Sequence, residues 1–273
     1  MTTAVLDLER VTTAVGAVVK DLDLRAALEP PIVDALRQAV AERGVLFFEG
    51  QDLSDEQMHA FAANFGRPVP DPAVGYEDRP AVEIADQAHG RKATSVWHFD
   101  TPFVANPPSL TGLRAVTMPS VGGDTCWANA QVAYDLLSAP VRDLLDGLTA
   151  LHSSAPAVAR LGTDRPGGEP LHSREAVHPV VRVHPETGRK TLYVNELTTV
   201  LILELSPAES DALLGLLFEH MKSPELMTRW RWRPNDVALW DNRTVQHFAV
   251  PDYEGPRVMQ RFVVDGDVPY GPR

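Results

Sequence analysis

The chain has 273 residues, 44% of them hydrophobic and 23% charged, so it can bury a substantial core without disulfides. Its formal net charge of -12 and the lack of a long Lys/Arg run argue against nucleic acid as a partner, because phosphate binding depends on clustered cations. The only cysteine, Cys126, excludes an internal disulfide and fits a reducing compartment.

The N-terminal residues carry scattered acidic side chains and no apolar run of the length that a secretion signal or a membrane span requires. We therefore expect a cytoplasmic protein with no membrane partner. No internal repeat, low-complexity tract or linker divides the chain, so we expect a single domain over residues 1–273.

Apolar side chains recur at helical spacing over residues 31–43, 54–66 and 206–222. Ser54 and Ser206 open the second and third of these segments, each with a Gln or Glu three residues later, which is the spacing of a capping box. The sequence therefore predicts three amphipathic helices.

Short β-strands dominate the rest of the chain, separated by Pro, Gly and Asn/Asp turns. The predicted strands cover residues 45–50, 95–100, 110–118, 176–183, 190–195, 236–241 and 257–264. A β-rich core with helices packed outside it is typical of a mixed α/β protein built on a jelly roll or barrel. Residues 152–175 are rich in Ser, Pro, Gly and Arg, and a connection of that length predicts a lid or binding loop.

His98 and Asp100 stand two residues apart in "SVWHFDTPF". In an extended segment such residues point to the same side, so an imidazole and a carboxylate converge on one point. A hydrogen-bonded pair explains this spacing as well as a metal site does, and a third ligand is needed to decide between them.

His247 is the best third ligand, because it follows the apolar strand and turn "DVALWDNR" among apolar neighbours. Two imidazoles and one carboxylate on one face of a metal leave open positions, a pattern suited to non-haem Fe(II) with a chelating co-substrate and oxygen. A metal-binding jelly roll without catalytic activity and a zinc hydrolase with an activated water are alternative interpretations of the same three residues.

Several motifs in the same order resemble the taurine dioxygenase (TauD/TfdA) family of Fe(II)- and 2-oxoglutarate-dependent oxygenases. They are "VLFFEGQDLSDEQMHAFAANFG", "WHFD", "GGDTCWAN", "HPVVRVHPETGRKTLYVNE", "RWRWRPNDVALWDN", "WDNRTVQH" and "DYEGPRVMQR", and they run through most of the chain. The resemblance implies a double-stranded β-helix of the cupin-like jelly-roll type, with His98, Asp100 and His247 as ligands of Fe(2+). It also implies that the protein is a dimer or a tetramer.

The resemblance assigns the far carboxylate of 2-oxoglutarate to Arg257, ten residues beyond His247, and to Thr125 in "GGDT". A planar guanidinium suits a carboxylate better than a lysine does. A surface arginine and a turn threonine are the structural alternatives. A bare metal site would need no carboxylate clamp, so this pair argues against a non-catalytic module and leaves a hydrolase without a use for its arginine.

Arg261 shares one face of the predicted strand 257–264 with Arg257. Two cations that point into one pocket repel each other, so their joint presence favours two anions, the co-substrate and a primary substrate. In sulfonate-using members of the family the matching arginine binds the substrate's anionic head. The structural alternative is an ion pair between Arg261 and Asp265 or Asp267.

The substrate side departs from the taurine enzyme. Asp71 and Thr94 occupy the positions that match its substrate-binding histidine and asparagine, and an aspartate would repel a sulfonate. We therefore predict a dioxygenase that hydroxylates, and thereby can cleave, a small anionic substrate other than taurine. Its cofactors would be Fe(2+), 2-oxoglutarate and O2, and its products would include succinate and CO2.

Overall fold

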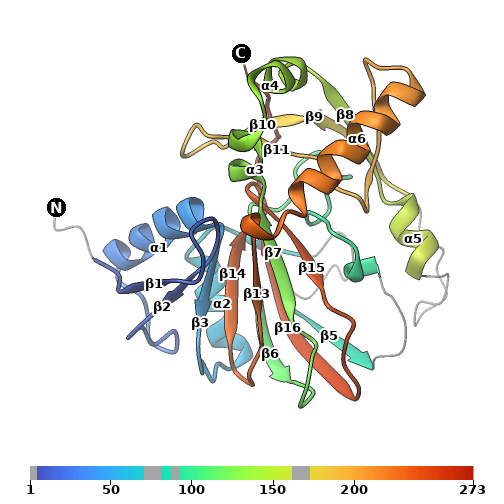
Figure 1. Ribbon diagram of the computed structural model, residues 1–273. Helices are drawn as coiled ribbons and strands as arrows, with labels where there is room; N and C mark the ends of the chain where they lie inside the picture. Colours follow the sequence, from blue (N-terminus) through green and yellow to red (C-terminus); the bar gives the residue numbers. More distant parts are fainter. Residues whose placement is uncertain (1–4, 71–80, 88–92, 162–172, 273) are drawn as a thin grey trace.

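Two β-sheets packed face to face form the centre of the protein (Figure 1). The computed structural model describes residues 5–70, 81–87, 93–161 and 173–272. The larger sheet has eight strands in the order β1-β2-β3-β14-β6-β16-β4, and β5 also pairs with β16. Its strands are β1 (Leu8–Arg10), β2 (Ala17–Val19), β3 (Val45–Phe48), β4 (Pro68–Val69), β5 (Ala81–Gln87), β6 (Leu110–Thr117), β14 (Val237–Asp241) and β16 (Pro256–Val264).

The smaller sheet has the order β13-β7-β15. Large aromatic side chains fill the space between the sheets: the ring of Trp127 lies 5.4 Å from that of Phe47 and 5.8 Å from that of Trp240. Two mainly antiparallel sheets around such a core form a jelly roll, so the predicted fold class is confirmed. The strands of the smaller sheet are β7 (Thr125–Asn129), β13 (Met227–Trp230) and β15 (Val245–Ala249).

Strand β3 shows why the central strands are apolar on both faces. Val45 and Phe47 pack between the two sheets, whereas Leu46 and Phe48 face the other way and join a cluster with helices α1 (Pro30–Arg43) and α2 (Asp55–Ala63). A strand covered on both faces loses the polar alternation of a surface strand. Both helices were predicted from the sequence, and the capping box at the start of α2 is present.

Helices α3, α4 and α6 lie above the two sheets in Figure 1 and share a further apolar cluster. Helix α6 begins with the predicted capping box, whereas α3 and α4 have seven residues each and were not predicted, because so few residues carry little periodicity. The elements of this region are α3 (Ala130–Leu136), α4 (Ala139–Leu145), α6 (Pro207–Met221), η2 (Pro224–Leu226), the sheet of β12 (Thr199–Ile202), β8 (Thr149–Ser153) and β9 (Glu175–Pro179), and the hairpin of β10 (Val181–Val183) and β11 (Lys190–Leu192).

Two predicted segments differ from the structure. Residues 95–100 do not form a strand: Ser95 ends the 3-10 turn η1 (Ala93–Ser95), and the residues after it make one isolated ladder pair, because the chain turns away at Thr101, whose φ is 48°. Within the predicted loop 152–175, the described residues include the end of β8, helix α5 (Ala155–Leu161) and the start of β9. Its role as a lid or binding segment stays a prediction.

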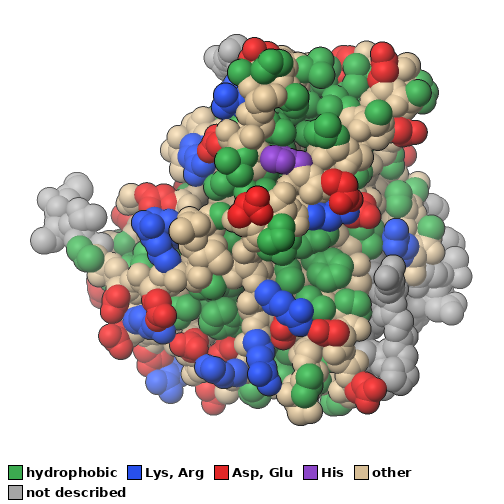
Figure 2. All heavy atoms as spheres, viewed as in Figure 1, with side chains coloured by type: hydrophobic (Ala, Val, Ile, Leu, Met, Phe, Trp, Pro, Cys, Tyr) green, Lys and Arg blue, Asp and Glu red, His purple; other side chains and the backbone are tan. Residues whose placement is uncertain are grey.

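The surface view in Figure 2 shows acidic and basic side chains mixed over the lower part of the face that is drawn. Among the described helices, none combines the length and the apolar character that are needed to cross a bilayer.

Gly112 of β6 tests how tightly β6 and β16 are packed. It lies opposite Phe262, and a Cβ at position 112 would overlap that ring. We expect Gly112→Ala to lower the free energy of unfolding in urea by about 1–3 kcal/mol, because overpacking displaces the ring. Gly215→Ala on the exposed side of α6, where a Cβ meets no atom within 4 Å, is the control and should be neutral or stabilising. An equal loss of unfolding free energy in Gly112→Ala and Gly215→Ala would contradict this explanation.

His152 of β8 lies in the layer that supports the segment around His98. Its ring lies 5.8 Å from that of Tyr193, which in turn contacts Phe99 at 5.0 Å. Burial lowers the pKa of His152 from 6.5 to about 3. The unfolded chain therefore binds a proton here at a higher pH than the folded protein does. The stability that the neutral ring provides is fully present above about pH 6.5 and is lost as the pH falls toward 3.

We expect His152→Phe, whose ring cannot be protonated, to be less sensitive to acid than the natural protein. The change in free energy of unfolding between about pH 7 and about pH 5 should shrink by roughly 1–2 kcal/mol. Urea unfolding at both pH values measures it. If His152→Phe changes the free energy of unfolding by the same amount at both pH values, protonation of His152 is not involved.

Candidate active site

Three side chains predicted to lie together do meet in the structure. One ligand atom from each of His98, Asp100 and His247 lies within 4.8 Å of the other two, and all three residues are buried. His247 lies on β15, and the other two lie on the segment that pairs with it. Among the residues that the structure describes, this is the group of His, Cys, Asp and Glu side chains with spacing suited to a metal ion.

The backbones of His98 and His247 bind each other directly. The amide of His98 donates to the carbonyl of His247 at 3.0 Å, and the amide of His247 donates back at 2.8 Å. This exchange sets the two rings side by side, with centroids 4.2 Å apart. The Nδ1 atom of His98 donates to the carbonyl of Val96 at 2.7 Å, which leaves Nε2 as the nitrogen available to a metal.

The two oxygens of Asp100 have different surroundings. Oδ1 lies 3.5 Å from Nε2 of His247 and 2.6 Å from Nη2 of Arg261, so it faces the centre of the site. Oδ2 points away and accepts a hydrogen bond from the hydroxyl of Thr111 at 2.9 Å. The carboxylate thus presents one oxygen to the point where the three side chains converge.

Burial prepares these side chains to bind a cation. It lowers the pKa of His98 and lowers that of His247 to about 3, so both imidazoles are neutral near pH 7. Burial is the largest single influence on Asp100 and raises its pKa, but the charge of Arg261, the two histidines and the hydrogen bond from Thr111 together outweigh burial and hold that pKa below its usual range. Two neutral nitrogens and one carboxylate oxygen form a donor set that suits a divalent first-row metal.

Arg257 and Thr125, the predicted carboxylate clamp, also lie together. Nη2 of Arg257 donates to the hydroxyl oxygen of Thr125 at 3.4 Å, and the indole of Trp232 donates to the same oxygen at 3.0 Å. A hydroxyl that accepts two hydrogen bonds directs its own hydrogen elsewhere, and here that hydrogen can be donated to an anion. Trp232 lies within the motif "RWRWRPNDVALWDN", but no role was predicted for it.

The loop before β7 fixes the guanidinium of Arg257, whose Nε donates to the carbonyl of Gly123 at 3.0 Å. The amide of Gly123 in turn donates to Asp252 at 3.1 Å. Arg229 of β13 pairs with Asp252 at 2.7 Å and with Asp124 at 2.6 Å, which ties the loop to the small sheet. Arg229 opens the motif "RWRWRPNDVALWDN", but its ion pairs were not predicted, because its partners lie elsewhere along the chain.

Arg261 was expected to bind substrate or to pair with Asp265 or Asp267. In the structure its guanidinium reaches Asp100, as described above, while Asp265 pairs with Arg67 at 3.3 Å and Asp267 with Arg182 at 2.6 Å. Arg261 therefore points into the same site as the histidines.

Thr94 and Asp71 are the two remaining predicted substrate residues. Thr94 belongs to the turn η1 and is exposed. Asp71 lies outside the described residues. Aromatic rings surround the histidines: Trp97 stacks on Phe248 with ring centroids 5.6 Å apart, and the ring of Trp240 lies 4.9 Å from that of His247.

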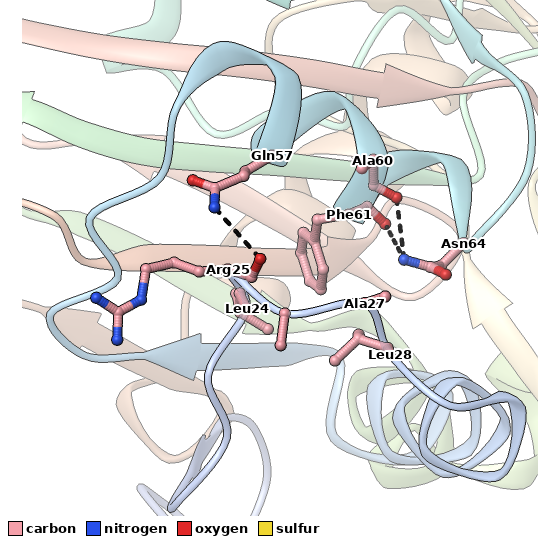
Figure 3. Close-up of a pocket in the computed structure, with 9 residues that line it drawn as sticks. Leu24, Arg25, Ala27, Leu28, Gln57, Ala60, Phe61 and Asn64 are labelled. Atoms are coloured by element: carbon pink, nitrogen blue, oxygen red, sulfur yellow. Dashed lines mark hydrogen bonds between the residues drawn. The ribbon is translucent and has the colours of Figure 1, made fainter.

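A cavity of about 230 Å³ lies elsewhere, between helix α2 and residues 24–28 (Figure 3). Its polar side chains are used within the protein: the amide of Gln57 donates to the carbonyl of Arg25, and that of Asn64 donates to the carbonyls of Ala60 and Phe61. These hydrogen bonds join the loop to the helix and end the helix at Asn64, so the lining offers no set of convergent groups for a ligand.

Comparisons with known proteins agree with this site. A family model described as taurine catabolism dioxygenase TauD, TfdA family matches residues 7–263. An alpha-ketoglutarate-dependent sulfate ester dioxygenase of Pseudomonas putida is 38% identical, and the match covers 97% of this chain and 91% of that protein. An alkylsulfatase of Acinetobacter baylyi is 35% identical, with 97% and 87% covered.

The crystal structure of a taurine dioxygenase from Burkholderia xenovorans has a TM-score of 0.84 at 38% sequence identity, and the match covers 98% of this chain and 91% of that one. The family model and these relatives span nearly all of the chain, which confirms the predicted resemblance. The protein therefore belongs to the TauD/TfdA family of 2-oxoglutarate-dependent dioxygenases.

Proposed function

We propose that this protein uses Fe(II), held by His98, Asp100 and His247, to hydroxylate a small anionic substrate at the expense of 2-oxoglutarate and O2. The observation that carries the proposal is the buried pair of histidines with one carboxylate oxygen facing them. Bound iron would supply the activation of O2, coupled to oxidative decarboxylation of 2-oxoglutarate to succinate and CO2.

The residues fit the metal on two counts. The Nδ1 atom of His98 is occupied by a backbone carbonyl, which orients Nε2 inward, and Nε2 of His247 already lies 3.5 Å from Asp100. Three ligands on one face would leave positions for a chelating co-substrate and for oxygen. The apolar rings of Trp97, Trp240 and Phe248 would limit access of water.

Arg257 and Thr125 would bind the far carboxylate of 2-oxoglutarate. The hydrogen bonds around them orient the guanidinium and leave the hydroxyl hydrogen of Thr125 available as a donor. A preorganised clamp of this kind lowers the cost of fixing the co-substrate beside the metal.

For the primary substrate we propose a sulfate ester of a small alcohol. The named activities of two relatives, a sulfate ester dioxygenase and an alkylsulfatase, point to this class, and Arg261 offers the cation for its sulfate. Hydroxylation of the carbon that carries the ester oxygen gives an unstable product, which would release sulfate and leave an aldehyde. Taurine stays disfavoured, because Thr94 replaces the matching asparagine.

The alternatives predict different results in one experiment. Protein purified without oxygen and loaded with Fe(II) would be mixed with 2-oxoglutarate, O2 and one candidate substrate, and succinate would be measured. The candidates would be alkyl sulfate esters, sulfonates, aryloxy acids and amino-acid derivatives. A non-catalytic module would form no succinate, whereas a zinc hydrolase would cleave the ester without 2-oxoglutarate.

Arg257→Ala tests the proposed clamp. We expect the dissociation constant of 2-oxoglutarate for the Fe(II)-loaded protein, measured without oxygen, to rise roughly 30-fold or more, because one partner of a buried charge pair is lost. Arg67→Ala, which removes an exposed arginine, is the control and should leave the constant unchanged. Unchanged binding in Arg257→Ala would refute the clamp.

Arg261→Gln tests the anion site. We expect KM for an active alkyl sulfate to rise roughly 30-fold or more, with the dissociation constant of 2-oxoglutarate changed less than about threefold. Because Arg261 also contacts Asp100, the affinity for Mn(II) must be measured in parallel. A weaker metal affinity with an unchanged KM would assign Arg261 to the metal site alone.

The cytoplasmic location, the dimeric or tetrameric state and the lid role of residues 152–175 stay predictions. Cell fractionation and the molar mass of the purified protein in solution would check the first two.

A further inference from the structure

A chain of hydrogen bonds runs from the core to the outward oxygen of Asp100. The indole Nε1 of Trp240 donates to Oδ1 of Asn242 at 3.0 Å, and Nδ2 of Asn242 donates to the hydroxyl oxygen of Thr111 at 2.6 Å. The hydroxyl of Thr111 then donates to Oδ2 of Asp100 at 2.9 Å. Trp240 and Asn242 lie in the motif "WDNRTVQH", but no part in orienting Asp100 was predicted for either of them or for Thr111.

The direction of this chain is fixed by its first member. An indole N–H can only donate, so the atom of Asn242 that faces Trp240 must be its carbonyl oxygen. The amide nitrogen of Asn242 therefore faces Thr111, and its hydrogen occupies an acceptor site on the threonine hydroxyl. The single hydrogen of that hydroxyl is left for Asp100.

The side chains of Trp240, Asn242 and Thr111 are also held rigidly. Trp240 and Thr111 lie opposite each other on the paired central strands β14 and β6, and Asn242 follows at the end of β14, where its amide donates to the carbonyl of Ser109 at 2.9 Å. All three side chains are buried to 1% exposure or less. A hydroxyl held this way cannot rotate freely to another partner.

We propose that Thr111 is a positioning residue that makes Asp100 bind the metal through one oxygen only. The inference rests on the proposed function, in which Asp100 is a metal ligand. With Oδ2 engaged by Thr111, only Oδ1 is presented to the metal. This matters because three protein ligand atoms, a bidentate co-substrate and oxygen together fill an octahedral metal. A carboxylate that bound through both oxygens would occupy the position that oxygen needs.

Thr111→Val, which keeps the shape of the side chain and removes its hydroxyl, tests the inference. We expect the dissociation constant of Mn(II), measured without oxygen, to rise roughly 10- to 100-fold. The visible absorption of the Co(II)-loaded protein should also change in intensity, because that absorption reports coordination number. Thr111→Ser restores the donor and should bring both measurements back toward the natural protein.

Thr191→Val is the matched control. Thr191 is a fully buried threonine on β11, and its hydroxyl makes no hydrogen bond within the described part of the chain. It should leave the Mn(II) constant and the Co(II) spectrum unchanged. If Thr111→Val does not fold, Asn242→Ala, which removes the donor to Thr111, is expected to give a smaller change in the same direction.

The outcomes separate this inference from the proposed function. If the natural protein binds Mn(II) and Asp100→Ala does not, Asp100 is a ligand, and natural values in Thr111→Val or in Asn242→Ala would then overturn only the role of Thr111. A Thr111→Ser variant as weak as Thr111→Val would also overturn it. If Asp100→Ala binds Mn(II) as tightly as the natural protein, the proposed metal site fails and this inference fails with it.

Discussion

The mutual backbone pairing of His98 and His247 is the contact on which the rest of the site depends. It attaches a segment that makes no other ladder pair among the described residues to β15, the outer strand of the small sheet. Because each residue exchanges both hydrogen bonds with the other, the two rings are set side by side before any ligand is considered. Asp100 follows two residues later, and the turn at Thr101 then takes the chain away.

The core between the sheets gives this pairing its rigidity. Trp127 of β7 lies directly opposite His247 in the ladder, and it packs against Phe47 and Trp240 of the large sheet. The same burial that stabilises these rings removes the histidines from water and lowers their pKa. Burial between the sheets therefore both packs the aromatic rings and keeps the two imidazoles neutral, which is the form that can bind a metal.

Strand β16 organises the charges of the site. Arg257 and Arg261 project from the same face of it as the buried Met259, so both guanidinium groups enter the space between the sheets. The contacts differ: Arg257 is held by the Gly123 carbonyl and Thr125, whereas Arg261 is drawn to Asp100. These different contacts agree with the proposal that Arg257 binds the co-substrate and Arg261 binds the substrate.

Local sequence signals determined the capped helices α2 and α6, the apolar central strands and, through the motifs around His98 and His247, the family and its chemistry. These local signals did not determine the features that depend on contacts with other parts of the chain. The strand expected at 95–100 proved to be one ladder pair, because strand formation depends on a partner. The hydrogen bonds of Thr111, Asn242 and Arg229 join separate elements of the chain, so only the tertiary structure decided which side chains orient the proposed metal ligands and the proposed clamp.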